Sequence, residues 1–357
     1  MSSLADGRDG GKPLRAAAVV GVAGLSLEER EADLIQEARP LGLILFKRNC
    51  ADPGQVTALI QAFRQAVGDP KAPVLIDQEG GRVTRLKPPH WRASASFREI
   101  GALSAHDLDA AKEAAWRHAR LIAADLWPLG VTINCSPVLD LGLPSQTEAI
   151  GDRAFSDDPG IVSVLGRSTI EGYLAGGVLP VIKHLPGHGR AMVDSHALLP
   201  CVEAETEVLA RADWKPFRDN ADAPLGMTAH ILFPALDQAA CATQSSAIVN
   251  DVIRGEIGFA GVLFSDDLSM QALGGSLGER AALARKAGCD IALHCNGDLD
   301  EMTEVLAAAG PLEGESLHRV ERALAAKKAP EPFDRDLGRE RLDALLSAAP
   351  QSREARS

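Results

Sequence analysis

The stretch Val181-Ile182-Lys183-His184-Leu185-Pro186-Gly187-His188-Gly189 decides the fold, and Asp194-Ser195-His196 follows it a few residues later. Apolar and β-branched residues at 177–182 predict a buried strand. Directly after that strand we expect a long loop that holds a lysine, three histidines and an aspartate. An ordinary turn does not need so many titratable groups, whereas the loops that follow the strands of an α/β barrel carry catalytic side chains. The stretch therefore predicts a barrel strand that leads into a functional site.

The composition is that of a globular protein, because 46% of the 357 residues are hydrophobic and 24% are charged. The formal net charge is −12 without a basic run, which argues against a nucleic-acid partner. Six scattered cysteines without a CxxC pair indicate a reduced, cytoplasmic protein. No apolar stretch is long enough to span a membrane. We expect a monomer, because the sequence shows no exposed apolar stripe that would indicate a subunit interface.

The apolar run at 16–25, which follows Arg15, has two interpretations. It could be the core of a signal peptide. It could also be the first barrel strand. We favour the strand because a helix start follows directly: Ser26, with Glu29 three residues further on, has the pattern of a capping box.

Apolar strands alternate with amphipathic helices along the chain. One predicted helix starts after Asp52, a cap followed by proline, and closes at Gly68; others are expected at 107–127, 300–309 and 339–348. The predicted strands cover residues 16–25, 41–46, 73–77, 131–134, 177–182, 226–230, 261–266 and 290–294.

Eight such units predict an α/β fold, a single-domain (β/α)8 TIM barrel with some irregular strands near its start. A doubly wound open sheet is the rival, but no GxGxxG follows the first strand. We see no internal repeat and no low-complexity linker. We therefore expect one domain over 1–357, with a core at about 14–309 and C-terminal helices and a tail at 310–357.

Most predicted strands end in polar residues. Asp77 ends the third strand, Arg153 follows the fourth, His230 ends the sixth and Asp266 ends the seventh. In a parallel barrel these ends lie on one face, so residues distant in sequence converge on one pocket. Carboxylates with many hydrogen-bond donors suit a polyhydroxylated substrate. The sequence has neither a phosphate-binding glycine loop nor a nucleophile elbow.

Glycosidic bond cleavage needs a carboxylate that faces the anomeric carbon and an acid at the leaving oxygen. Asp266 is a candidate nucleophile, although spacing alone does not separate it from Asp267. His196, with Asp194 two residues earlier, is a candidate acid because histidine titrates near neutral pH.

A metal cluster is the alternative for the histidines of the central stretch; it would consist of His184, His188, Asp194 and His196. Lys183 and nearby arginines would disfavour a cation, so we expect no metal and no cofactor. We expect His188 to shape the loop, and His230 and Met270 to form pocket wall or core. Arg82 could make a structural ion pair or touch the substrate.

Four motifs, taken in this order, resemble glycoside hydrolase family 3, and most closely its bacterial β-N-acetylhexosaminidases. The resemblance covers roughly Leu14 to Ala309. The matching stretches are Asp77-Gln78-Glu79-Gly80-Gly81-Arg82-Val83-Thr84-Arg85, Lys183-His184-Leu185-Pro186-Gly187-His188-Gly189, Asp194-Ser195-His196 and Ser265-Asp266-Asp267-Leu268-Ser269-Met270.

The resemblance implies roles for these residues. Asp266, rather than Asp267, corresponds to the nucleophile of a retaining double displacement. Asp267 is left to make supporting hydrogen bonds or to cap a helix. His196 corresponds to the acid/base and Asp194 to its dyad partner. The residues that correspond to binders of the N-acetylglucosamine unit are Asp77, Arg85, Arg153, Lys183 and His184.

The family's usual substrate is an N-acetylglucosaminyl-anhydro-muropeptide, a fragment of cell-wall recycling in the cytoplasm. The expected partner is therefore a small carbohydrate or muropeptide. A phosphorylase and a β-glucosidase are the enzymatic alternatives. A non-catalytic sugar-binding protein would not need the His196–Asp194 dyad. Aromatic residues make up only 4% of the chain, which favours one hydrogen-bonded sugar subsite over a long cleft.

Overall fold

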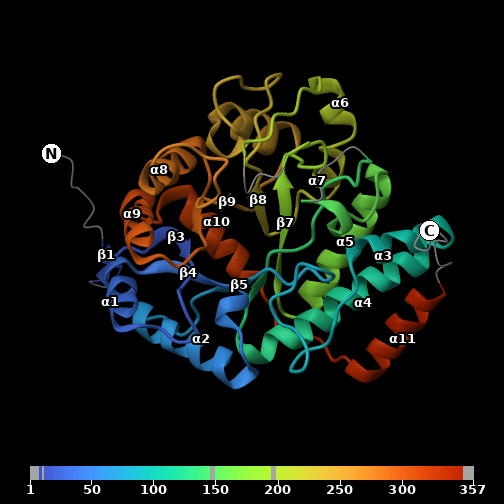
Figure 1. Cartoon of the computed structure of the whole chain (residues 1–357), viewed down its shortest axis with the longest axis horizontal. Coiled ribbons are helices and arrows are strands. Elements are labelled where there is room, and N and C mark those ends of the chain that lie inside the picture. Colours follow the sequence, from blue (N-terminus) through green and yellow to red (C-terminus); the bar gives the residue numbers. More distant parts are fainter. Residues whose placement is uncertain (1–7, 10–11, 145–148, 194–197, 349–357) are drawn as a thin grey trace.

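Eight parallel strands close into a barrel in the computed structural model, which describes residues 8–9, 12–144, 149–193 and 198–348 (Figure 1). Neighbouring strands pair in chain order, and β10 pairs with β3 to close the barrel. A short antiparallel pair, β1 (Arg8–Asp9) and β2 (Lys12–Pro13), precedes them. The predicted (β/α)8 TIM barrel is confirmed. The barrel strands are β3 (Ala16–Val20), β4 (Pro40–Leu45), β5 (Val74–Ile76), β6 (Ile133–Asn134), β7 (Leu179–Leu185), β8 (Leu225–Thr228), β9 (Val262–Asp267) and β10 (Ile291–His294).

Helices surround the barrel (Figure 1). A π-helix at Ile248–Glu256 lies between β8 and β9. Within the described residues, no helix has the length and apolar character needed to cross a membrane. The α-helices are α1 (Glu29–Ala38), α2 (Pro53–Val67), α3 (Phe97–Ala102), α4 (Leu108–Leu126), α5 (Pro159–Ala175), α6 (Thr206–Arg211), α7 (Lys215–Asp219), α8 (Leu277–Ala287), α9 (Leu299–Ala309), α10 (Gly314–Ala325) and α11 (Arg335–Ser347).

The start of the first helix differs from its prediction. The strand interpretation of the first apolar run is confirmed for β3, but α1 starts at Glu29 instead of directly after Ser26. Its capping box joins Glu28 and Glu31, not Ser26 and Glu29. The reason is tertiary: the buried Glu31 carboxylate accepts the backbone N–H of both Ala23 and Glu28, which anchors the helix start further along the chain.

The strand at the centre of the sequence argument is also longer than predicted. β7 continues past Ile182 to Leu185, so Lys183 and His184 are strand residues and not loop residues. Leu185 still pairs with Thr228 of β8. Both polar side chains are buried, because residues distant in sequence form ion pairs with Lys183 and a hydrogen bond with His184. A search for apolar runs therefore ends the strand too early.

Side-chain alternation decides which residues point into the barrel. Leu75 of β5, Val181 of β7 and Phe264 of β9 belong to the cluster that fills the barrel interior. Successive strand residues point to opposite faces, so the residue two positions further along returns to the interior side. At the C-terminal ends of these strands, the residues in that position are Asp77, Lys183 and Asp266.

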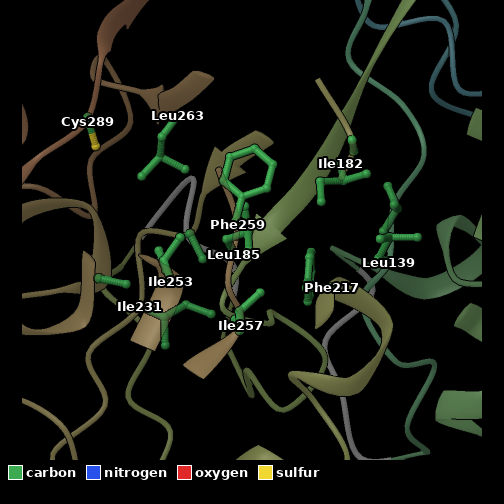
Figure 2. Packing of buried hydrophobic residues seen from close by; sticks show 14 of the residues in the cluster. Leu139, Ile182, Leu185, Phe217, Ile231, Ile253, Ile257, Phe259, Leu263 and Cys289 are labelled. Carbon is green, nitrogen blue, oxygen red and sulfur yellow. The ribbon is translucent and has the colours of Figure 1, made fainter. Parts of the chain in front are cut away.

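A second cluster fills the space between the barrel wall and the outer elements, and Figure 2 shows part of it. Phe259 lies in the middle of this view, with Leu263 and Leu185 beside it. Gly226 of β8 makes this packing feasible. A Cβ atom there would lie 2.7 Å from Leu185 Cδ1 and 2.8 Å from Phe259 Cζ.

Helix α10 closes the barrel at the N-terminal ends of its strands. Its Val320 and Ala323 join the interior cluster together with Leu41 and Leu225. The last helix, α11, packs against α4 and starts at Arg335, earlier than the predicted 339, because the Asp334 side chain accepts the first free N–H groups (Figure 1).

Candidate active site

A cavity of about 370 Å³ opens at the C-terminal ends of the barrel strands. This volume lies at the small end of the roughly 300–1,000 Å³ that small-molecule pockets occupy. Its apolar lining includes Phe46, Met227, Met270 and Leu293. Its charged and histidine lining consists of Asp77, Glu79, Arg82, Arg85, Arg153, Lys183, His184, His188, Asp266 and Asp267.

The structure brings together every described residue that the sequence predicted for the site. The five predicted sugar-binding residues and the predicted nucleophile, Asp266, all line this one cavity. The predicted acid/base pair, Asp194 and His196, lies outside the described residues.

Lys183 is the centre of a buried ionic network. Its Nζ lies 2.9 Å from Asp77 Oδ1 and 2.7 Å from Glu79 Oε1. Asp77 also accepts a hydrogen bond from Arg85 Nη2 at 3.0 Å. Glu79 accepts two from Arg153, from Nε and Nη2, each at 2.8 Å. Each carboxylate therefore has two cationic partners, which is the condition under which buried charges are tolerated.

These contacts set the charge state of the network. Burial raises the pKa of Asp77, but attraction to Lys183 and Arg85 outweighs it and holds that pKa well below its usual range. The pKa of Glu79 falls to about 2, because Arg153 and Lys183 outweigh the effect of burial. Burial lowers the pKa of Lys183, but the two carboxylates raise it above its ordinary value. All three groups are therefore charged at neutral pH, and the pocket wall presents fixed charges to a ligand.

The two histidines of the central stretch are held by a second buried acid, Asp140. Its Oδ2 lies 2.6 Å from His184 Nδ1, and its Oδ1 accepts the backbone N–H of His188 at 2.6 Å. The rings of His184 and His188 meet edge to face, with centroids 5.6 Å apart. Burial, with His184 beside it, lowers the pKa of His188 to about 4, so that histidine is neutral at physiological pH.

Asp266 is the last interior-facing residue of β9 and is only partly buried. Its Oδ1 accepts the N–H of Asp267 at 2.8 Å. Burial raises the pKa of Asp266, but the neighbouring His230 and His184 and this amide outweigh it, so the pKa lies below its ordinary value. Asp266 is thus an ionised carboxylate at the pocket wall.

The side chain of the neighbouring Asp267 accepts hydrogen bonds from nearby residues of the protein. Its Oδ1 accepts the N–H groups of Ser269 and Cys295, at 3.0 and 3.2 Å, and its Oδ2 accepts the Ser269 hydroxyl at 2.7 Å. These contacts tie the end of β9 to the end of β10. The geometry therefore distinguishes the two adjacent aspartates, which spacing in the sequence did not.

The other residues of the site that the sequence singled out lie close to it. Arg82 lines the pocket mouth and pairs with Asp152, with 2.7 Å between Nε and Oδ1. Met270 is pocket wall. His230 is buried between Thr243 Oγ1 at 2.7 Å and the Asp267 carbonyl at 2.9 Å.

Sequence reasoning did not select Glu79 and Asp140 as site residues. Glu79 lies inside the quoted Asp77-Gln78-Glu79 motif. A charged residue so close to the end of a predicted strand could have been selected as a site residue. Asp140 ends the apolar run Val138-Leu139, which has the same pattern as the other strand ends but belongs to no regular strand. The partners of both acids lie far away in sequence.

A larger cavity, of about 920 Å³, lies at the opposite end of the barrel, near the N-terminal ends of the strands. Leu41, Thr132 and Leu324 are among its lining residues, and none of the predicted site residues is. In parallel barrels the N-terminal face serves stability and the C-terminal face carries catalysis, so the smaller cavity is the candidate active site.

A parallel barrel that gathers an ionised aspartate and many donors at its catalytic face fits the class of glycoside hydrolases. Residues 13–325 match the glycosyl hydrolase family 3 N-terminal domain, and the chain belongs to this family.

Individual relatives agree with this assignment. A β-hexosaminidase of Xanthomonas euvesicatoria pv. vesicatoria is 39% identical over 285 residues, which are 79% of this chain and 84% of the relative. A family 3 β-N-acetylglucosaminidase from Paenibacillus sp. superposes with a TM-score of 0.79 at 31% identity, over 92% of this chain and 66% of that one. NagZ from Neisseria gonorrhoeae, solved with N-trifluoroacetyl-D-glucosamine, has a TM-score of 0.78 at 29% identity, over 94% and 99%. The predicted resemblance and the predicted enzyme class, a family 3 β-hexosaminidase, are confirmed.

Proposed function

We propose that this enzyme removes a terminal β-linked N-acetylglucosamine by double displacement, with Asp266 as the nucleophile. The observation that carries the proposal is the position of Asp266: an ionised carboxylate at the end of β9, on the wall of a small pocket whose other polar groups are tied into fixed networks. Such a carboxylate can attack an anomeric carbon without first losing a proton.

The rest of the pocket suits recognition of one sugar. Asp77, Arg85, Arg153, Lys183 and His184 provide both donors and acceptors, held in place by their mutual contacts. Preorganised groups of this kind bind hydroxyl and amide groups without further ordering. Support for N-acetylglucosamine comes from the relatives, one of which was solved with an N-acylated glucosamine.

In this proposal His196, oriented by Asp194, donates a proton to the leaving oxygen while Asp266 attacks. His196 then removes a proton from the water that hydrolyses the glycosyl-enzyme. This assignment rests on the family motif, because both residues lie outside the described part of the chain. A histidine base is neutral once it is deprotonated. It therefore tolerates an anionic group beside it better than a second carboxylate would.

We extend the proposal to an N-acetylglucosaminyl-anhydro-muropeptide as the natural substrate, and to peptidoglycan recycling in the cytoplasm. Support comes from the family motifs and from the cysteines, all six of which are free thiols. We also propose a monomer, for which light scattering should give a mass near 37.6 kDa.

The first test measures chromophore release from an aryl β-N-acetylglucosaminide, with and without phosphate. Free N-acetylglucosamine at a phosphate-independent rate is expected. A sugar 1-phosphate would make the enzyme a phosphorylase, and cleavage of the β-glucoside instead would refute the sugar assignment. The natural substrate is tested by comparison of the disaccharide that carries anhydromuramic acid with the aryl glycoside.

The second test compares two neighbouring substitutions. Asp266→Asn should abolish turnover. Asp267→Asn keeps an acceptor for the Ser269 and Cys295 amides and should retain most activity. A variant Asp266→Asn with nearly normal turnover would refute the nucleophile assignment.

A further inference from the structure

Asp140 is close to the active site but is not part of the pocket lining. It is 1% exposed, lies in the segment after β6, and contacts two histidines of the pocket lining, His184 and His188. Its carboxylate accepts from His184 Nδ1 at 2.6 Å, from the His184 backbone N–H at 3.2 Å and from the His188 backbone N–H at 2.6 Å. One buried acid therefore fixes both the ring of His184 and the start of the loop after β7.

The charge state of Asp140 follows from these contacts. Burial raises its pKa, but His184 and the other donors outweigh burial and hold the pKa below its ordinary value. An ionised carboxylate has no hydrogen to donate. The proton in the 2.6 Å contact must therefore reside on His184 Nδ1.

The other ring nitrogen of His184 faces a group of the opposite kind. His184 Nε2 lies 3.5 Å from Arg153 Nη2, at the long end of hydrogen-bond distances. A guanidinium group can only donate, so Nε2 accepts in this contact. A hydrogen on Nδ1 and a lone pair on Nε2 satisfy both acceptor-only Asp140 on one side and donor-only Arg153 on the other.

We propose that Asp140 is a positioning residue that holds His184 as the Nδ1–H tautomer, so that Nε2 presents a lone pair to the pocket. Among the described residues, the charged and titratable groups around His184 include Asp140, Arg153, His188, Asp266 and His230. The proposal deepens the proposed function, because an acceptor at this place selects a ligand that offers a hydroxyl or amide hydrogen.

The tautomer can be measured without turnover. The whole enzyme is prepared with ¹⁵N-labelled histidine rings, and the His184 signals are assigned by their loss in His184→Gln. At neutral pH we expect a protonated Nδ1 and an unprotonated Nε2 for His184. A hydrogen on Nε2, or on both nitrogens, would overturn the proposal. Because this experiment uses the free enzyme, its failure would leave the proposed function untouched.

The role of Asp140 is then tested with a matched pair of substitutions. Asp140→Asn removes a charge-assisted hydrogen bond, so we expect kcat/KM to fall by roughly 10- to 100-fold, mainly through KM, and the His184 signals to move toward the other tautomer. Asp290→Asn is the control. Asp290 is also 1% exposed and accepts from Arg254 and Arg319, but it precedes β10 at the far end of the barrel.

The control should lower stability and leave both kcat/KM and the His184 signals unchanged. Equal effects of the two substitutions on KM would reduce Asp140 to a structural residue. If Asp140→Asn does not fold, the ring measurement on the unsubstituted enzyme still decides the tautomer.

Discussion

Lys183→Met should destabilise this enzyme far more than Lys112→Met, although the two lysines make ion pairs of the same length. Each Nζ lies 2.9 Å from an aspartate oxygen, Asp77 for Lys183 and Asp109 for Lys112. The Lys183 side chain is 3% exposed and also contacts Glu79, whereas Lys112 is 45% exposed and its partner 91%. Methionine preserves most of the lysine stem, so the comparison isolates the charge.

The magnitude follows from burial. Removal of one partner from a buried ion pair costs about 3–5 kcal/mol, because the remaining charge stays buried without its counter-ion. Arg85 and Arg153 would still contact the two carboxylates, so we expect about 3 kcal/mol for Lys183→Met. An exposed pair contributes about 0–1 kcal/mol, which is the expectation for Lys112→Met.

The difference should depend on pH. In the folded protein Glu79 has a pKa of about 2, against an ordinary value of 4.5. A carboxyl group whose pKa is lowered by folding stabilises the folded state at pH values above its pKa in the unfolded chain. This stabilisation is lost as the pH falls toward its pKa in the folded protein. Lys183→Met should raise the pKa of Glu79 and Asp77 in the folded state. Acidification should therefore lower the free energy of unfolding less in the variant than in the unsubstituted enzyme. The free-energy gap between it and the unsubstituted enzyme should therefore narrow from pH 7 toward pH 3.5.

The assay is urea unfolding followed by tryptophan fluorescence at pH 7, 5 and 3.5, with activity recorded separately. The transition should keep its slope and shift its midpoint in Lys183→Met only. Equal midpoint shifts in the two variants would refute the argument that burial makes the Lys183 ion pairs contribute more to stability than the exposed Lys112 pair. So would a difference in unfolding free energy between Lys183→Met and the unsubstituted enzyme that does not change with pH.

Other substitutions test separate parts of the structure. Gly226→Ala should cost about 1–3 kcal/mol because its Cβ would meet Leu185 and Phe259, whereas Gly274→Ala, with no atom within 4 Å, should cost almost nothing in urea unfolding. Burial lowers the pKa of His118 to about 3, from 6.5. The unfolded chain therefore binds a proton there that the folded one does not, and stability falls as the pH drops below about 6.5. His118→Gln should reduce that slope by up to about 1.4 kcal/mol per pH unit. Glu79→Gln should lower kcat/KM by roughly 10- to 100-fold in the aryl glycoside assay, because Arg153 loses its charged partner; unchanged kinetics would contradict this.

Much of the architecture could be predicted because its signals are local. Apolar runs separated by capped helices indicate a barrel of strands and helices, and Asp52 and Gly68 mark the ends of α2 as expected. The four motifs, in their order along the chain, indicated the family from the residues themselves. Local signals failed where a distant group decides the outcome, as at the start of α1, where the carboxylate of Glu31 sets the cap.

By itself, the sequence determined the fold class and the family. It also singled out six residues that line the pocket at the C-terminal ends of the strands, but it did not single out Glu79 or Asp140. These predictions depend on period, spacing and motif, which are properties of short segments. Only the tertiary structure decided how the charges are paired. Lys183 and Asp77 are 106 residues apart, Arg153 and Glu79 are 74 apart, and His184 and Asp140 are 44 apart. Closure of the barrel brings these groups within hydrogen-bond distance. Burial then makes each pairing obligatory, because an unpaired charge in that environment would be too costly.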